Sequence, residues 1–269
     1  MRRGLAQSSS FSLLDSAAIQ IRVLNALVIR EALTRYGHDN LGFFWVFAEP
    51  IMLAFMVMIM WSFTTHGQVD QIGIIPFVLT GYSALTLWRH TLSGSVRAMR
   101  RRASLLFHRN VKPFDIIMAM VKLEIIGVFA AFVVAFIPLW ILGFVPTPHD
   151  PLLTLGGWLL LGWFSLSVGM VLAAASELAE PVEHFVQPLM YVTIPLTGTF
   201  YLIDWMPQRA QEVLLYSPLV NCMEMFRAGI FIPDTHLHYS AGYVAICCFA
   251  LMAIGFPLMV YAQRHVEHY

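Results

Sequence analysis

Charged residues are scarce in this chain of 269 residues. Asp, Glu, Lys and Arg together make up 12% of it, hydrophobic residues make up 58%, and the mean hydropathy is +0.70. A typical soluble domain has about 25% charged residues, so this composition excludes an ordinary soluble enzyme and predicts a protein that crosses a membrane repeatedly. The net charge is zero, which disfavours a globally basic nucleic-acid binder, and we expect no nucleic-acid partner.

Sequence motifs for catalysis and metal binding are also missing. The cysteines Cys222, Cys247 and Cys248 form neither a disulfide framework nor a CxxC metal pair. The only lysines, Lys112 and Lys122, lack the glycine-rich context of a phosphate-binding loop. We therefore expect no catalytic residue, metal or cofactor in this chain. An intramembrane enzyme that acts on lipid or glycan is the alternative from another class.

Six long runs are almost free of charge, and a membrane core about 30 Å thick needs about 20 such residues per helix. We predict membrane spans at 41–65, 72–88, 125–144, 152–176, 185–203 and 241–262. Every Lys and Arg except Arg209 and Arg227 then lies on one side of the membrane. Positive charge marks the cytoplasmic side, so this all-α, multi-pass arrangement places both termini in the cytoplasm.

The segments around these spans differ in character. Residues 1–40 form a cytoplasmic N-terminal segment. Within it, residues 11–36 have apolar residues at three- and four-residue steps, which predicts an amphipathic helix on the cytoplasmic membrane surface. The transmembrane domain extends over 41–262, and 263–269 form a cytoplasmic tail. Within 204–240, proline and charged residues interrupt an apolar run, so we predict two short helices that dip into the outer leaflet. A seventh crossing over 213–232 is the alternative.

The cytoplasmic loop at 89–122 combines positive charge with an apolar turn that projects from it. A short helix there would end before Pro113. Arginine clusters commonly hold loops against anionic lipid, but the apolar turn suits insertion into a groove on a soluble partner. The residues predicted to dock there are Arg100, Arg101, Arg102, Leu105, Leu106, Phe107 and His108.

Three motifs stand in order along the chain: RYGHDNLGFFWVFAEP at 35–50, NVKPFDIIMA at 110–119 and SPLVNCMEMFRAGIF at 217–231. With the spans around them, the whole chain resembles the permease subunit of type-2 ABC exporters. The Glu49-Pro50 ending of the first motif resembles the capsular polysaccharide export branch more than the O-antigen branch. A permease for O-antigen or teichoic acid is the alternative within the family.

This resemblance implies a homodimer in the bacterial inner membrane with the pore at the dimer interface. A pair of separate ATP-binding subunits would bind ATP and Mg²⁺, and the loop at 89–122 would carry the coupling helix that docks on them. The cargo would be a lipid-linked acidic polysaccharide, with periplasmic and outer-membrane export proteins as further partners. The acidic turn at 177–183 would be a second contact with the ATP-binding subunit.

Three sets of residues would form the substrate path. At the cytoplasmic entrance, guanidinium can bind a phosphate or carboxylate bidentately, and the set is Arg35, Tyr36, Leu41, Gly42 and Trp45. Ordinary lipid phosphate and an aromatic belt at the membrane interface are the alternatives. Aromatic rings and hydroxyls suit a pore wall for sugars, and this set is Tyr191, Thr193, Thr197, Thr199, Phe200 and Tyr201. The outer gate would contain Glu224 and Arg227, which can pair on one helical face.

Overall fold

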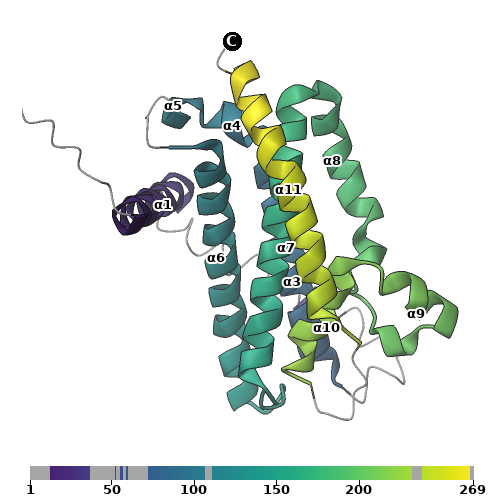
Figure 1. Ribbon diagram of the computed structural model, residues 1–269. Helices are drawn as coiled ribbons and strands as arrows, with labels where there is room; N and C mark the ends of the chain where they lie inside the picture. Colours follow the sequence, from purple (N-terminus) through teal and green to yellow (C-terminus); the bar gives the residue numbers. More distant parts are fainter. Residues whose placement is uncertain are drawn as a thin grey trace, which may run out of the picture.

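The computed structural model describes residues 13–36, 52, 55–56, 59, 72–106, 111–231 and 238–266 (Figure 1). Every regular element within these residues is a helix, as the all-α prediction requires. The predicted first span, 41–65, lies almost entirely outside the described residues.

Three of the described helices are long and apolar enough to cross a membrane. They are α6 (Pro113–Ile141), α7 (Pro151–Leu178) and α11 (Ala241–Val266). Helices α7 and α11 cover the fourth and sixth predicted spans, and α6 covers the third except for its last three residues. The second predicted span corresponds to α3 (Ile74–Ser95), which has 22 residues but carries Arg89 and several hydroxyl side chains.

Helix α7 is the centre of the bundle and contacts α3, α6, α10 and α11. Two of its glycines let neighbouring helices approach closely, Gly157 against backbone and Gly169 against a side chain. A Cβ atom on Gly157 would lie 2.4 Å from the backbone nitrogen of Phe226 in α10, and one on Gly169 would lie 2.7 Å from Oγ of Ser95 in α3. A larger side chain at either position would therefore separate α7 from its neighbour.

The two ends of the bundle differ in their short helices (Figure 1). One end carries α4 (Ala98–Arg101), α5 (Ala103–Leu106) and the C-terminal end of α11. The opposite end carries α9 (Gln208–Leu214) and α10 (Pro218–Ala228), so two short helices are present within 204–240 as expected, and their placement in the outer leaflet stays a prediction. Because α10 has only 11 residues, it is too short to be a seventh crossing.

The predicted continuous span at 185–203 is wrong. Helix α8 (Glu180–Val192) begins earlier and ends at Val192, and a 3₁₀ turn, η2 (Ile194–Leu196), follows it. Pro195 has no N–H to donate to a continuing helix and disfavours helical geometry at the residue before it. Gly198 then adopts a φ of 74°, in the left-handed region where glycine carries no Cβ penalty. The chain therefore turns back at 197–201.

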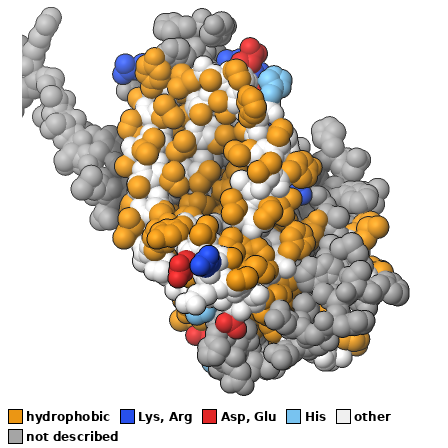
Figure 2. Space-filling model, turned by 90° about the vertical axis from the view of Figure 1, so that its right-hand side faces the viewer, with side chains coloured by type: hydrophobic (Ala, Val, Ile, Leu, Met, Phe, Trp, Pro, Cys, Tyr) orange, Lys and Arg blue, Asp and Glu red, His pale blue; other side chains and the backbone are white. Residues whose placement is uncertain are grey.

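The outer surface of the bundle is strongly apolar. Figure 2 shows a broad band of hydrophobic side chains on one face, with most charged groups near its two ends. Ile246 and Phe249 of α11 are 70% and 64% exposed, and Ile141 of α6 is 73% exposed. Soluble monomers rarely expose apolar patches of this extent, so the band is a surface for lipid or for another membrane helix.

Candidate functional site

The arginine-rich loop and the acidic turn between α7 and α8 bind each other. Nε of Arg97 lies 2.7 Å from the carboxylate of Glu183, and its Nη2 lies 3.3 Å from that of Glu180. The backbone N–H of Arg100 donates to Oε1 of Glu177 at 2.8 Å. We name these five residues the Arg–Glu junction. The acidic turn, which we expected to face the ATP-binding subunit, thus lies against arginines of its own chain.

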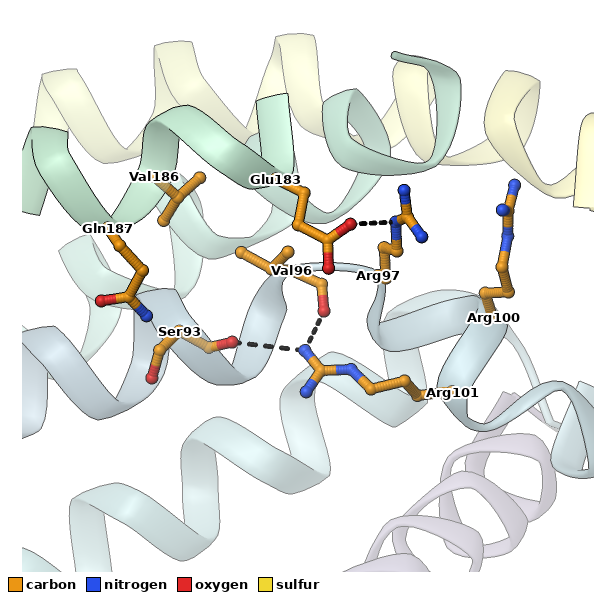
Figure 3. A pocket seen from close by; sticks show the side chains of 8 residues that line it. All are labelled: Ser93, Val96, Arg97, Arg100, Arg101, Glu183, Val186 and Gln187. Carbon is orange, nitrogen blue, oxygen red and sulfur yellow. Dashed lines mark hydrogen bonds and ion pairs between the residues drawn. The ribbon is translucent and has the colours of Figure 1, made fainter. Parts of the chain in front are cut away.

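A cavity of about 500 Å³ lies beside this junction (Figure 3). The end of α3 contributes Ser93 to its lining, α4 contributes Arg100 and Arg101, and α8 contributes Glu183 and Gln187. Figure 3 shows Glu183 pointing toward the arginine side of this cavity. The cavity therefore lies between α4 and the first turns of α8.

Two further arginines of the loop are also held within the chain. Arg101 donates through Nη2 to the carbonyls of Ser93, Gly94 and Val96, which are left without helical partners where α3 ends. Partial burial, followed by the neighbouring Arg102 cation, lowers the pKa of the Arg101 guanidinium from its ordinary value. Arg102 forms an ion pair with Glu31 of α1 (Leu13–Tyr36). These guanidinium groups therefore brace the loop instead of extending freely toward lipid.

The apolar part of the loop is less prominent than the sequence suggested. Leu106 packs against a buried cluster that includes Met99, Ile117 and Met259, and Leu105 is only half-buried. The prediction that this turn projects as a free knob is therefore wrong for Leu106, because the ends of α6 and α11 supply an apolar surface. Phe107 and His108 lie outside the described residues, and their role in docking stays a prediction.

Helix α1 is confirmed over most of the predicted amphipathic segment, but many of its polar side chains face the bundle. Its polar contacts with α6 are Gln20 with Asp115, Asn25 with Lys122 and Arg35 with Glu124, and Glu31 contacts Arg102 between α4 and α5. Ile21, Ile29 and Leu33 are exposed on the other side. A helix that lies in a membrane interface buries such an apolar face in lipid. The opposite, polar face of α1 is the one that binds the rest of the protein.

At the predicted entrance, Arg35 is already paired. Its guanidinium binds the buried carboxylate of Glu124, which also lies 3.3 Å from Nδ1 of His90. Any phosphate that reached Arg35 would compete with Glu124 for the guanidinium. The Tyr36 side chain and all of Leu41, Gly42 and Trp45 lie outside the described residues.

The predicted pore residues differ in burial, and Thr193 and Tyr201 are half-buried. Tyr191 and Phe200 are exposed. Thr197 and Thr199 are buried, and their hydroxyl oxygens lie 2.7 Å apart. The Thr193 hydroxyl donates to the carbonyl oxygen of Met190 in α8, and the Tyr201 hydroxyl donates to the carbonyl oxygen of Pro195. In this conformation, two of the threonines therefore stabilise the turn at 197–201 from inside the protein.

Arg227 holds that turn against α10. It is fully buried, and it donates through Nη1 to the carbonyl oxygens of Gly198 at 2.7 Å and Tyr201 at 2.9 Å. Its Nη2 donates to the carbonyl oxygen of Thr199 at 2.7 Å. The guanidinium carbon also lies 4.3 Å from the ring centroid of Phe77 in α3. One side chain thus joins α10, α3 and the turn.

The predicted ion pair between Glu224 and Arg227 is wrong: among the described residues, no ion pair joins them. Glu224 instead accepts the backbone N–H groups of Ile203 at 3.4 Å and His238 at 3.3 Å. The carbonyl oxygens of the turn accept the hydrogen bonds of Arg227. They can do so because this backbone is not part of a helix, so no helical N–H occupies them. Both residues therefore hold irregular backbone at this end, whereas spacing along a helix had suggested that they hold each other.

Comparison with known proteins relates these features to a family. Residues 22–231 match the family described as ABC-2 type transporter. The chain is 36% identical to the capsule polysaccharide export inner-membrane protein CtrC of Neisseria meningitidis serogroup B, over 94% of this chain and 96% of that protein. It is 32% identical to BexB of Haemophilus influenzae, which bears the same description, over 94% and 96%. It is 23% identical to the polysialic acid transport protein KpsM of Escherichia coli, over 91% and 95%.

Proposed function

Because this chain belongs to the ABC-2 type transporter family, we propose that it is the permease subunit of an ATP-driven exporter of capsular polysaccharide. The observation that carries this proposal is the match, over nearly the full length of both chains, to CtrC and BexB, which are named for capsule polysaccharide export. The cargo is a lipid-linked acidic polymer that moves from the cytoplasm to the periplasm. The permease itself performs no covalent chemistry.

The proposed membrane arrangement has six spans in the bacterial inner membrane and both termini in the cytoplasm. Helices α6, α7 and α11 are three of the spans, and α3, residues 41–65 and the broken segment from α8 through the turn at 197–201 are the others. The arginine-rich loop supports a cytoplasmic position for the end that carries α4 and α5. Helices α9 and α10 then lie in the outer leaflet at the opposite end.

Transport in this proposal requires a second copy of the chain and a pair of ATP-binding subunits. The two permeases form the pore between them, and the partner subunits bind ATP and Mg²⁺. Periplasmic and outer-membrane export proteins would receive the polymer. The exposed apolar residues of α8, among them Phe185 and Leu189, offer a surface for the second copy.

The loop that carries α4 and α5 is the proposed docking site for the ATP-binding subunit. Support comes from its position beside the Arg–Glu junction, since a partner that displaces α4 also displaces Arg97 and Arg100. These arginines contact Glu183 of α8 and Glu177 of α7. A movement imposed on the loop would therefore reach the helix that precedes the proposed pore wall.

Deletion of the gene for this chain in its own host tests the proposal. We expect capsular polymer to disappear from the surface and to accumulate in the cytoplasm, as seen when antibody labels permeabilised cells but not intact ones. A plasmid copy of the gene should restore surface capsule, while surface O-antigen serves as the control and should be unchanged. Normal surface capsule in the deletion strain, or loss of O-antigen instead, would contradict the assignment.

A further inference from the structure

A second cavity, of about 450 Å³, lies at the end of the bundle that carries α9 and α10. Three tyrosines contribute to its lining, together with a carboxylate, an amide and a hydroxyl group. They are Glu212, Tyr216, Asn221, Tyr239, Ser240 and Tyr243, and the remaining lining residues are Leu215 and His238. In the proposed orientation, this end faces the periplasm.

The walls of this cavity are bonded to each other. The amide nitrogen of Asn221 donates to the carbonyl oxygens of Leu215 at 2.8 Å and Ser217 at 3.0 Å, and its Oδ1 accepts the Ser240 N–H at 2.8 Å. The hydroxyl of Tyr243 donates to the carbonyl oxygen of Tyr216 at 2.8 Å. The connection between α9 and α10 is thus fixed to the beginning of α11. A preformed site of this kind lowers the ordering cost of binding.

The exposed groups in this cavity match the surface of a sugar ring. Tyr216 and Tyr239 are 75% and 40% exposed, and each offers an aromatic face with a hydroxyl group at its edge. Among the described residues, no hydrogen-bond partner occupies the Glu212 carboxylate, which can accept from sugar hydroxyls. Tyrosines of an interfacial belt face the lipid headgroups, whereas these side chains line a concave site beside a carboxylate.

We propose that this cavity is a carbohydrate-binding site that holds a short stretch of the exported polysaccharide after it leaves the pore. The inference rests on the proposed function for the identity of the sugar. The aromatic rings stack on the apolar faces of the sugars, and Glu212 accepts hydrogen bonds from their hydroxyl groups. The Glu212 charge also repels carboxylates of an acidic polymer, so the site binds weakly and releases the chain.

Binding of a soluble probe to the purified transporter complex in lipid nanodiscs tests this site. The probe is a set of delipidated capsular oligosaccharides, about ten sugars long, from the host strain, and saturation-transfer NMR measures binding. Tyr216→Ala and Tyr239→Ala each remove one aromatic face from the site, so each should weaken binding about two- to tenfold. Tyr216→Phe should keep most of the affinity. Tyr261→Ala, which removes an exposed tyrosine from the opposite end of α11, should have no effect.

The outcomes separate this inference from the proposed function. Wild-type binding that both alanine variants retain would overturn the site, as would the absence of binding to a wild-type complex that exports capsule. A photoreactive residue at position 216 that cross-links to a periplasmic protein, without protection by oligosaccharide, would also overturn it. Failure of the proposed function would appear separately, as normal surface capsule in the deletion strain. ATP hydrolysis by each variant complex verifies that the complex is assembled.

Discussion

Replacement of Arg227 by methionine removes the side chain that joins α10, α3 and the turn at 197–201. Methionine keeps an unbranched apolar stem but donates no hydrogen bond. The carbonyl groups of Gly198, Thr199 and Tyr201 then lose donors that now lie 2.7–2.9 Å away. Each buried carbonyl left without a donor costs about 1–3 kcal/mol, and relief from burying a cation offsets part of that cost. We expect a net loss of about 3–5 kcal/mol in the free energy of unfolding.

Thermal unfolding of the purified permease in detergent measures this loss. At about 2–4 °C per kcal/mol for a chain of this size, Arg227→Met should lower Tm by about 10 °C. Gly81→Ala tests the same contact without removing the charge, since its Cβ would lie 2.6 Å from the Thr199 carbonyl oxygen and 2.7 Å from Nη2 of Arg227. It should also lower Tm.

Arg209→Met is the matched control, because Arg209 is exposed on α9. Its Tm should equal that of the wild-type protein. An Arg227→Met variant that unfolds within about 2 °C of wild type would refute the argument that this residue holds the three segments together.

Three other perturbations examine the loop and the orientation of the bundle. Leu106→Asp places a carboxylate against the apolar cluster beneath the loop, and surface capsule should be lost while the dimer stays in the membrane; normal export would show that the packing of Leu106 is not needed to hold the loop in place. Arg97→Glu should impair export, and Glu183→Arg in the same chain should partly restore it. A thermal double-mutant cycle should give a coupling of about 0.2–1 kcal/mol, as for other partly exposed pairs, and zero coupling would contradict the junction. Single cysteines at Asp150 and Met225, in a chain otherwise free of cysteine, should react with an impermeant maleimide from outside; cytoplasmic labelling at Met225 would contradict the orientation.

Local patterns predicted much of the fold. The apolar spacing of residues 11–36 predicted α1, and charge-free length predicted α6, α7 and α11, because both signals depend on nearby residues alone. The interrupted run within 204–240 similarly predicted α9 and α10. The broken segment after α8 was missed, although Pro195 and Gly198 were visible as signals that disfavour a continuous helix.

The site was harder to predict because its contacts join distant parts of the chain. Arg97 and Glu183 lie 86 positions apart, and only their shared place on the cytoplasmic side suggested that they could meet. The partners of Arg227 are mainly backbone carbonyl groups, which every residue carries, so no sequence pattern could identify them. Leu41, Gly42, Trp45, Phe107 and His108 lie outside the described residues, and their roles stay predictions.

The central helix has a mechanical consequence for transport. Glu177 near one end of α7 accepts the Arg100 N–H, and Gly157 near the other end lies against the backbone of α10. At a rise of about 1.5 Å per residue, these two points are about 30 Å apart on one rod, a distance close to the thickness of the membrane core. A tilt of α7 about its middle would displace the loop that carries α4 and the helix α10 in opposite directions. A movement at one end of α7 would thus reach the other end directly, without a series of side-chain rearrangements between them.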